Sequence, residues 1–154
     1  MTPRVRVVGV GHPDRGDDAA GLDVLDRIRA RAPADMDIVR AASDGPALLA
    51  QIESLLHVVI VDCARGGGAP GAILRLDTAS LAALPPAHRH SHGNALAEAL
   101  ALGEALGCLP ARLTILAVVG ERFGIGDAMS PAVRAALPSL ASRALEEATC
   151  TNTG

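Results

Sequence analysis

The sequence has almost no aromatic residues. Among 154 residues there is one phenylalanine, with no tryptophan and no tyrosine. Aliphatic side chains must therefore fill the core, and helices and strands must pack closely because no large ring can fill gaps. Enough hydrophobic residues are present to form a core, since they make up 49% of the sequence. The shortage also leaves no platform for stacking nucleic-acid bases, and a net charge of −3 provides no basic excess. We therefore expect no nucleic-acid partner.

Cysteines are also scarce. Cys63, Cys108 and Cys150 are odd in number and show no CxxC spacing, which argues against a disulfide framework or a zinc–thiolate site. Such usage fits a reducing compartment. The apolar stretch at the N-terminus is short and ends in glycines and charges, as a first strand does and a signal peptide does not. No run approaches the roughly 20 apolar residues of a membrane span. We expect a cytoplasmic protein without a membrane partner.

Strand-like and helix-like patterns alternate along the chain. Short runs rich in β-branched residues predict strands at 4–10, 36–40, 57–61, 72–76 and 112–119. Amphipathic stretches with capping residues predict helices at 17–31, 43–55, 94–106 and 131–148. This alternation predicts a three-layer α/β sandwich, in which a mostly parallel, five-stranded, twisted sheet has helices on both faces.

Two details of this prediction concern connections and ends. The fourth strand follows the third after a short glycine-rich turn, so we expect these two strands to form an antiparallel hairpin. No linker or repeat interrupts the chain, which indicates a single domain over residues 1–148. The polar end, residues 149–154, is expected to be a flexible tail.

A glycine-rich segment, GVGHPDRGDD, follows the first predicted strand. A dinucleotide-binding fingerprint needs glycine at the sixth position, where this chain has Asp14. Carboxylates at Asp14, Asp17 and Asp18 would repel a pyrophosphate at the helix start. Neighbouring residues of a helix point about 100° apart. At most one of Asp17 and Asp18 can therefore face a site above the sheet, and the residues alone do not decide which.

Asp62 follows the apolar run HVVIV. An ionised carboxylate beside a buried strand is costly unless it is paired. Ligands of parallel α/β sheets bind outside the carboxyl ends of the strands, which is the edge that Asp62 shares with the glycine-rich segment. Asp62 is thus a candidate site residue. The alternative is a strand-end aspartate that only caps a turn.

Three histidines at alternate positions, His88, His90 and His92, precede a predicted helix. Side chains at this spacing line one side of an extended segment. One imidazole and two carboxylates suit a borderline divalent ion that keeps open positions. The alternative is that these histidines are solvated, and the pattern does not single out one of them.

Familiar catalytic motifs are missing. The sequence contains neither a GxSxG elbow nor an HExxH helix. Cys63 follows Asp62 directly, and a strand would point the two side chains to opposite faces. A buried structural thiol is the favoured interpretation of Cys63, and a catalytic cysteine–histidine pair is the weaker alternative.

Five segments resemble, in order, those of the hydrogenase maturation proteases, and together they span about residues 5–140. They are GVGHPDRGDDAAG, SDGPALLAQI, VIVDCA, SHGNALAEALALGEALG and GIGDAMSPAVRAALP. The resemblance implies an endopeptidase that removes the C-terminal extension of a nickel–iron hydrogenase large-subunit precursor after nickel insertion. It also implies that Asp18, Asp62 and His92 are the catalytic and metal-binding residues. The nickel would be carried by the substrate as a recognition element.

The chain departs from the family pattern at two positions. His12 stands where the family usually has asparagine, either as a tolerated exchange or as an added ligand. Asp18 stands where some members have glutamate, which is one methylene longer. The residues leave two other functions open. One is a non-catalytic module that binds metal or precursor, because no conventional nucleophile is apparent. The other is a nucleotide-binding domain.

Overall fold

The computed structural model describes residues 5–77, 80 and 95–150. Within them, five strands form one sheet in the order β2-β1-β3-β5-β4. The strands are β1 Val5–Gly9, β2 Met36–Arg40, β3 His57–Arg65, β4 Ile73–Asp77 and β5 Arg112–Gly120. The helical elements are η1 Gly16–Ala19, α1 Ala20–Arg29, α2 Gly45–Ile52, α4 Ala95–Leu106 and α5 Pro131–Thr149.

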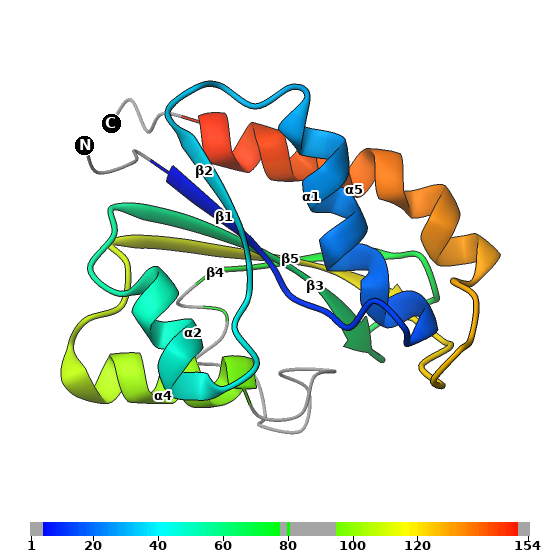
Figure 1. Cartoon of the computed structure of the whole chain (residues 1–154), viewed down its shortest axis with the longest axis horizontal. Helices are drawn as coiled ribbons and strands as arrows, with labels where there is room; N and C mark the ends of the chain where they lie inside the picture. The colour runs from blue at the N-terminus through cyan, green and yellow to red at the C-terminus, as the bar shows by residue number, and fades with distance from the viewer. Residues whose placement is uncertain (1–4, 78–79, 81–94, 151–154) are drawn as a thin grey trace.

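The sheet lies between two helical layers, as the alternation of patterns predicts. Helices α1 and α5 cover one face, and α2 and α4 cover the other (Figure 1). The strand β3 supplies both layers of the core: Val59 and Val61 pack toward α1 and α5, while Val58 and Ile60 pack toward α2 and α4. This alternation is the two-residue period of a strand.

The core is aliphatic and closely packed, which confirms the prediction drawn from the missing aromatics. The one phenylalanine, Phe123, is only partly buried against the core. Gly21 on α1 shows how closely the layers approach. A Cβ atom there would lie 2.3 Å from the Val10 carbonyl oxygen and 2.5 Å from that of Val61. Only glycine lets the helix backbone approach the strand ends this closely.

The predicted hairpin between the third and fourth strands is wrong. β4 pairs antiparallel with β5, in a register that places Ile73 opposite Val118. β3 has β1 along one edge and β5 along the other, both parallel, so neither edge is left for β4. Proximity in the sequence favours a hairpin, but the return of β5 alongside β3 decides the pairing.

Two element boundaries also differ from the prediction. β3 continues to Arg65, because β5 pairs with it over its whole length, and Asp62 therefore lies inside the strand. The helix predicted from Asp17 begins as the 3-10 turn η1, and α1 starts only at Ala20. The N-terminal cap of α2 agrees with the prediction. The Asp44 side chain accepts a hydrogen bond from the Ala47 amide at the start of this helix.

Some predictions fall on residues that the structure does not describe. They include His88, His90 and His92, as well as residues 151–154 of the predicted tail. Thr149, which the sequence predicts to belong to that tail, is the last residue of α5. Among the helices of the described ranges, none combines the length and the apolar character needed to cross a membrane.

Candidate functional site

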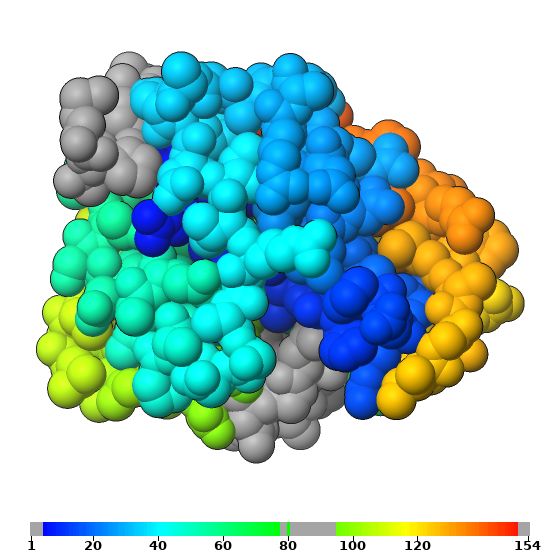
Figure 2. Space-filling model, in the orientation of Figure 1, coloured from blue at the N-terminus to red at the C-terminus, as the bar shows by residue number. Residues whose placement is uncertain are grey.

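A pocket of about 350 Å³ lies at the carboxyl edge of the sheet. It is bounded by the segments after β1 and β2, by the end of β3 and by the start of α4. Figure 2 shows this surface, where the blue segment after β1 approaches the cyan segment after β2. The lining side chains that carry chemistry are His12, Arg15, Asp18, Ser43 and Arg65. The pocket is therefore where ligands of parallel α/β sheets are expected to bind.

The structure separates the two neighbouring carboxylates that the sequence left equivalent. Asp18 lines the pocket and is 4% exposed, whereas Asp17 is completely buried. Both belong to η1, and successive residues of a 3-10 helix point about 120° apart. The Asp17 side chain thus lies in the interior, while Asp18 is one of the residues that line the pocket.

The Asp17 carboxylate holds the loop after β5 in place. One oxygen accepts hydrogen bonds from the backbone amides of Glu121 (2.8 Å) and Arg122 (2.9 Å) and from the Ser130 hydroxyl (2.9 Å). The other accepts from the Ser130 amide at 2.6 Å. Burial alone would raise the pKa of Asp17, but these hydrogen bonds outweigh burial and lower the pKa below its ordinary value. Asp17 is therefore a charged structural group.

Asp62 is the second buried carboxylate at this edge, with 2% of its surface exposed. Its Oδ1 accepts a hydrogen bond from the Cys63 amide at 2.7 Å. The alternation of β3 places Asp62 on the face of Val58 and Ile60, which is the face of α2 and α4. Val10, which lines the pocket, packs in the same layer. Asp62 is therefore a residue within β3 and not a turn cap, and it is not one of the described residues that line the pocket.

Cys63 points to the opposite face of β3, as predicted, and is fully buried in the layer of α1 and α5. Burial raises the pKa of the Cys63 thiol, and the charges of Asp62, Asp17 and Asp18 raise it further. The effect also indicates that all three carboxylates lie within electrostatic range of one sulfur atom. A protonated, buried thiol is a poor nucleophile, so Cys63 is a structural residue.

This assignment makes a prediction for thiol chemistry. In the folded protein, iodoacetamide should alkylate the exposed Cys150 and leave Cys63 unmodified, because only an accessible thiolate reacts. Mass spectrometry of peptides with and without denaturant measures this difference. Alkylation of Cys63 at the rate of Cys150 under native conditions would contradict it.

Two arginines at the pocket were not singled out in the sequence. Arg15 comes from the loop before η1, and Arg65 is the last residue of β3. The Arg65 guanidinium lies over the Phe123 ring, 4.2 Å from its centroid, which holds it at the edge of the sheet. The sequence feature that could have indicated Arg65 is its position three residues after Asp62 on the same strand. The pocket thus combines carboxylate and guanidinium groups.

The third predicted site residue, His92, lies outside the described residues, so its role stays a prediction. The chain enters the described region again at Ala95, which lines the pocket at the start of α4. The backbone therefore returns to this edge of the sheet three residues after His92.

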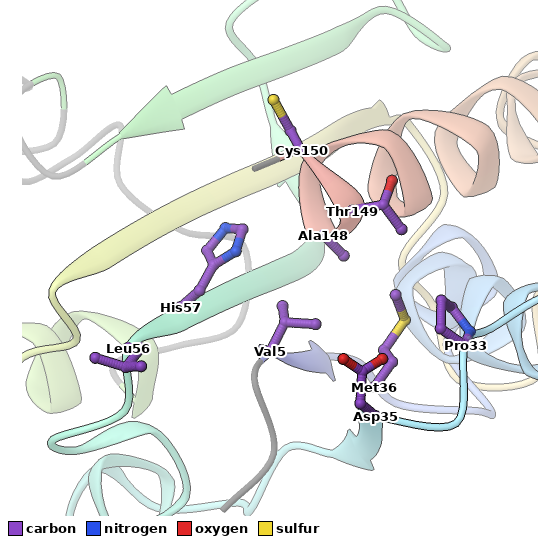
Figure 3. A pocket seen from close by; sticks show the side chains of 9 residues that line it. All are labelled: Val5, Pro33, Asp35, Met36, Leu56, His57, Ala148, Thr149 and Cys150. Atoms are coloured by element: carbon purple, nitrogen blue, oxygen red, sulfur yellow. The ribbon is translucent and has the colours of Figure 1, made fainter. Parts of the chain in front are cut away.

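A second hollow, of about 410 Å³, lies at the opposite edge of the sheet (Figure 3). It is formed by the first residues of three strands, Val5, Met36 and His57, and by the end of α5. Burial lowers the pKa of His57, and the nearby charge of Arg112 lowers it further against an opposing effect of Glu147. The amino ends of parallel strands are not where the ligands of such sheets bind.

Comparison with known proteins identifies the fold. No curated protein sequence matches the chain. Among solved structures, the hydrogenase maturating endopeptidase HybD from E. coli is 24% identical, with 91% of this chain and 88% of that chain covered and a TM-score of 0.80. Another endopeptidase from Escherichia coli is 24% identical, with 95% and 94% covered and a TM-score of 0.83. The [NiFe] hydrogenase maturation protease HybD from Thermococcus kodakarensis is 19% identical, with 95% and 99% covered and a TM-score of 0.76.

The sequence itself identifies the family. The model of the family described as hydrogenase maturation protease matches residues 24–147, which is most of the chain. The match includes Asp62 and the strands β2 to β5, and it begins after β1 and η1, so Asp18 lies outside the matched residues. This chain belongs to the hydrogenase maturation protease family and is an endopeptidase.

Proposed function

We propose that the protein removes the C-terminal extension of a nickel–iron hydrogenase large-subunit precursor after nickel insertion. The observation that carries the proposal is the position of two buried carboxylates, Asp18 after β1 and Asp62 in the carboxyl half of β3, toward the same edge of the sheet in a chain of this family. His92 is the proposed third ligand. The nickel enters with the substrate, and the protease binds it only for recognition.

The chemistry of the two carboxylates suits this role. Oxygen and imidazole ligands bind borderline divalent ions such as nickel. Three ligands from the protease leave coordination positions for the groups of the precursor that hold the ion. A metal recognised in this way reports that the precursor is loaded and places the adjoining peptide in the pocket. Arg15 and Arg65 add positive charge that can bind carbonyl or carboxylate oxygens of that peptide.

The nucleotide-binding alternative requires free backbone amides at the helix start. Here the Asp17 amide donates to the Arg122 carbonyl at 2.8 Å, and the Asp18 amide donates to the Arg15 carbonyl at 3.0 Å. These donors are therefore already used within the protein. A pyrophosphate would also face the Asp18 carboxylate, so the structure disfavours this alternative.

Incubation with a nickel-loaded precursor tests the proposal and separates it from the binding-module alternative. We expect the precursor to lose the mass of its extension, whereas the same precursor prepared without nickel should stay intact. Intact-mass spectrometry measures both. A loaded precursor that co-purifies with the protein but keeps its extension would support the binding module and overturn the proposed hydrolysis.

A further inference from the structure

Within the described residues, β2 is an edge strand of the sheet and has β1 as its neighbour (Figure 1). The Ala41 amide, directly after β2, donates to the Gly9 carbonyl at 2.9 Å and continues the parallel ladder between the two strands. The backbone groups of successive strand residues point to opposite sides of the strand. The odd-numbered residues of β2 therefore direct their amides and carbonyls to β1. The even-numbered residues direct theirs away from β1, to the free edge of β2.

The side chain of Gln51 agrees with this alternation at the end of β2. Its Nε2 donates to the Arg40 carbonyl at 2.8 Å, and its Oε1 accepts from the Ala42 amide at 2.7 Å. A carboxamide that binds a carbonyl and the amide two residues further on takes the place of a neighbouring strand. The Gln51 backbone is itself tied to β1, because its carbonyl accepts a hydrogen bond from the Arg6 guanidinium at 2.6 Å. Gln51 thus closes the free edge where β2 ends.

Before this closed position, the free edge still offers hydrogen-bonding groups. The amides of Ile38 and Arg40 and the carbonyls of Met36 and Ile38 point away from β1, and no group in the described ranges hydrogen-bonds to them. Arg40 is exposed, and the middle of β2 is only partly buried. Open amides and carbonyls at a sheet edge are a template for pairing with another extended chain.

The free edge of β2 leads into the pocket. Ala41, Ala42 and Ser43, the three residues after β2, line the pocket together with Asp18. An extended chain that pairs along β2 meets the Gln51 side chain at the end of the strand and must leave the edge there, where the pocket begins. The other edge strand of the described sheet is β4, and none of its residues lines the pocket. The position of the pocket therefore favours β2 over β4.

We propose that the precursor segment beside the scissile bond binds as an added strand at the free edge of β2. The inference rests on the proposed function of the site. The substrate of an endopeptidase is a polypeptide, and its own amides and carbonyls are complementary to the open groups of Ile38 and Arg40. Main-chain pairing supplies affinity for many side-chain sequences. Gln51 sets the register, because it ends the pairing beside the pocket and so determines which peptide bond enters it.

Arg40→Pro tests the added strand. Proline removes the outward amide of this residue and leaves the bonds between β2 and β1 in place. We expect the KM for the nickel-loaded precursor to rise roughly 10-fold, because a peptide carbonyl loses its donor, while kcat stays near the wild-type value. Arg40→Ala is the matched control, since it removes the same exposed side chain but keeps the amide, and its KM should be unchanged. A wild-type KM in Arg40→Pro, with a normal melting temperature, would overturn the inference.

Amide hydrogen exchange, followed by NMR, gives a measurement that does not depend on the proline variant. In the free protein, the amides of Ile38 and Arg40 should exchange much faster than those of Val39 and Ala41, which bind β1. Saturation with a synthetic peptide that spans the cleavage site should slow exchange at Ile38 and Arg40. Equal protection of Arg40 and Val39 in the free protein, or unchanged exchange under saturation, would overturn the inference. Failure of the wild-type protein to cleave the loaded precursor would instead overturn the proposed function.

Discussion

Replacing Asp17 by alanine should destabilise the protein by about 3 kcal/mol, because a buried donor left without an acceptor costs about 1–3 kcal/mol and one buried and two partly buried amides would lose theirs. The exchange removes the acceptor of the Glu121, Arg122 and Ser130 amides and leaves a cavity in a fully buried position. Asp17→Asn should also destabilise, since its NH₂ group would face one of these amide donors. Urea unfolding followed by circular dichroism measures the change.

The neighbouring residue supplies the matched control. Asp18→Asn changes the next carboxylate in the same 3-10 turn, but this residue lines the pocket. It should lose much less stability than Asp17→Asn while losing cleavage. Equal loss of stability in the two variants would show that the division between a structural and a functional carboxylate is wrong.

The charge of Asp17 should also make the stability of the protein depend on pH in the acid range. The pKa of Asp17 is lowered in the folded protein, so the unfolded state binds its proton first as the pH falls. The stabilisation from this group is therefore complete above its unfolded pKa and is lost as the pH falls through the folded value. The stability of Asp17→Asn should depend less on pH in that acid range than the stability of the wild type.

The second large effect concerns catalysis. Asp62→Asn should lower cleavage of the loaded precursor by more than about 100-fold, because even outer-shell partners of metal ligands contribute 10–100-fold. The exchange keeps the volume and removes the charge. His92→Ala should abolish cleavage, whereas His88→Ala should not. Intact-mass kinetics measures all three, with the melting temperature of each variant as the control for folding.

Retained cleavage by Asp62→Asn, with a normal melting temperature, would remove Asp62 from the metal-recognition site. Equal loss of cleavage in His88→Ala and His92→Ala would remove the distinction that rests on the family resemblance. In contrast, loss in both Asp62→Asn and Asp18→Asn, with His88→Ala unaffected, would support two carboxylates and one imidazole acting together.

Much of this protein follows from local patterns. The β-branched runs and capped amphipathic stretches predict the five strands and the helices α1, α2, α4 and α5 of the described residues, and the missing aromatics predict the close aliphatic packing of the core. Position toward the carboxyl ends of the strands also brings Asp62 and the 11–18 segment to one edge, because parallel strands end together. These features depend on residues near each other in the chain, where periodicity and capping act.

Only the tertiary structure decided the rest. It assigned Asp17 to the interior and Asp18 to the pocket, because the amides that hold Asp17 come from a loop more than 100 residues further along the chain. It paired β4 with β5, since β5 occupies the free edge of β3. It also brought Arg15 and Arg65 to one pocket. For the predicted metal site, the sequence by itself supplies the candidate residue types and the sheet edge, and long-range contacts hold Asp17 in the interior and leave Asp18 at the pocket.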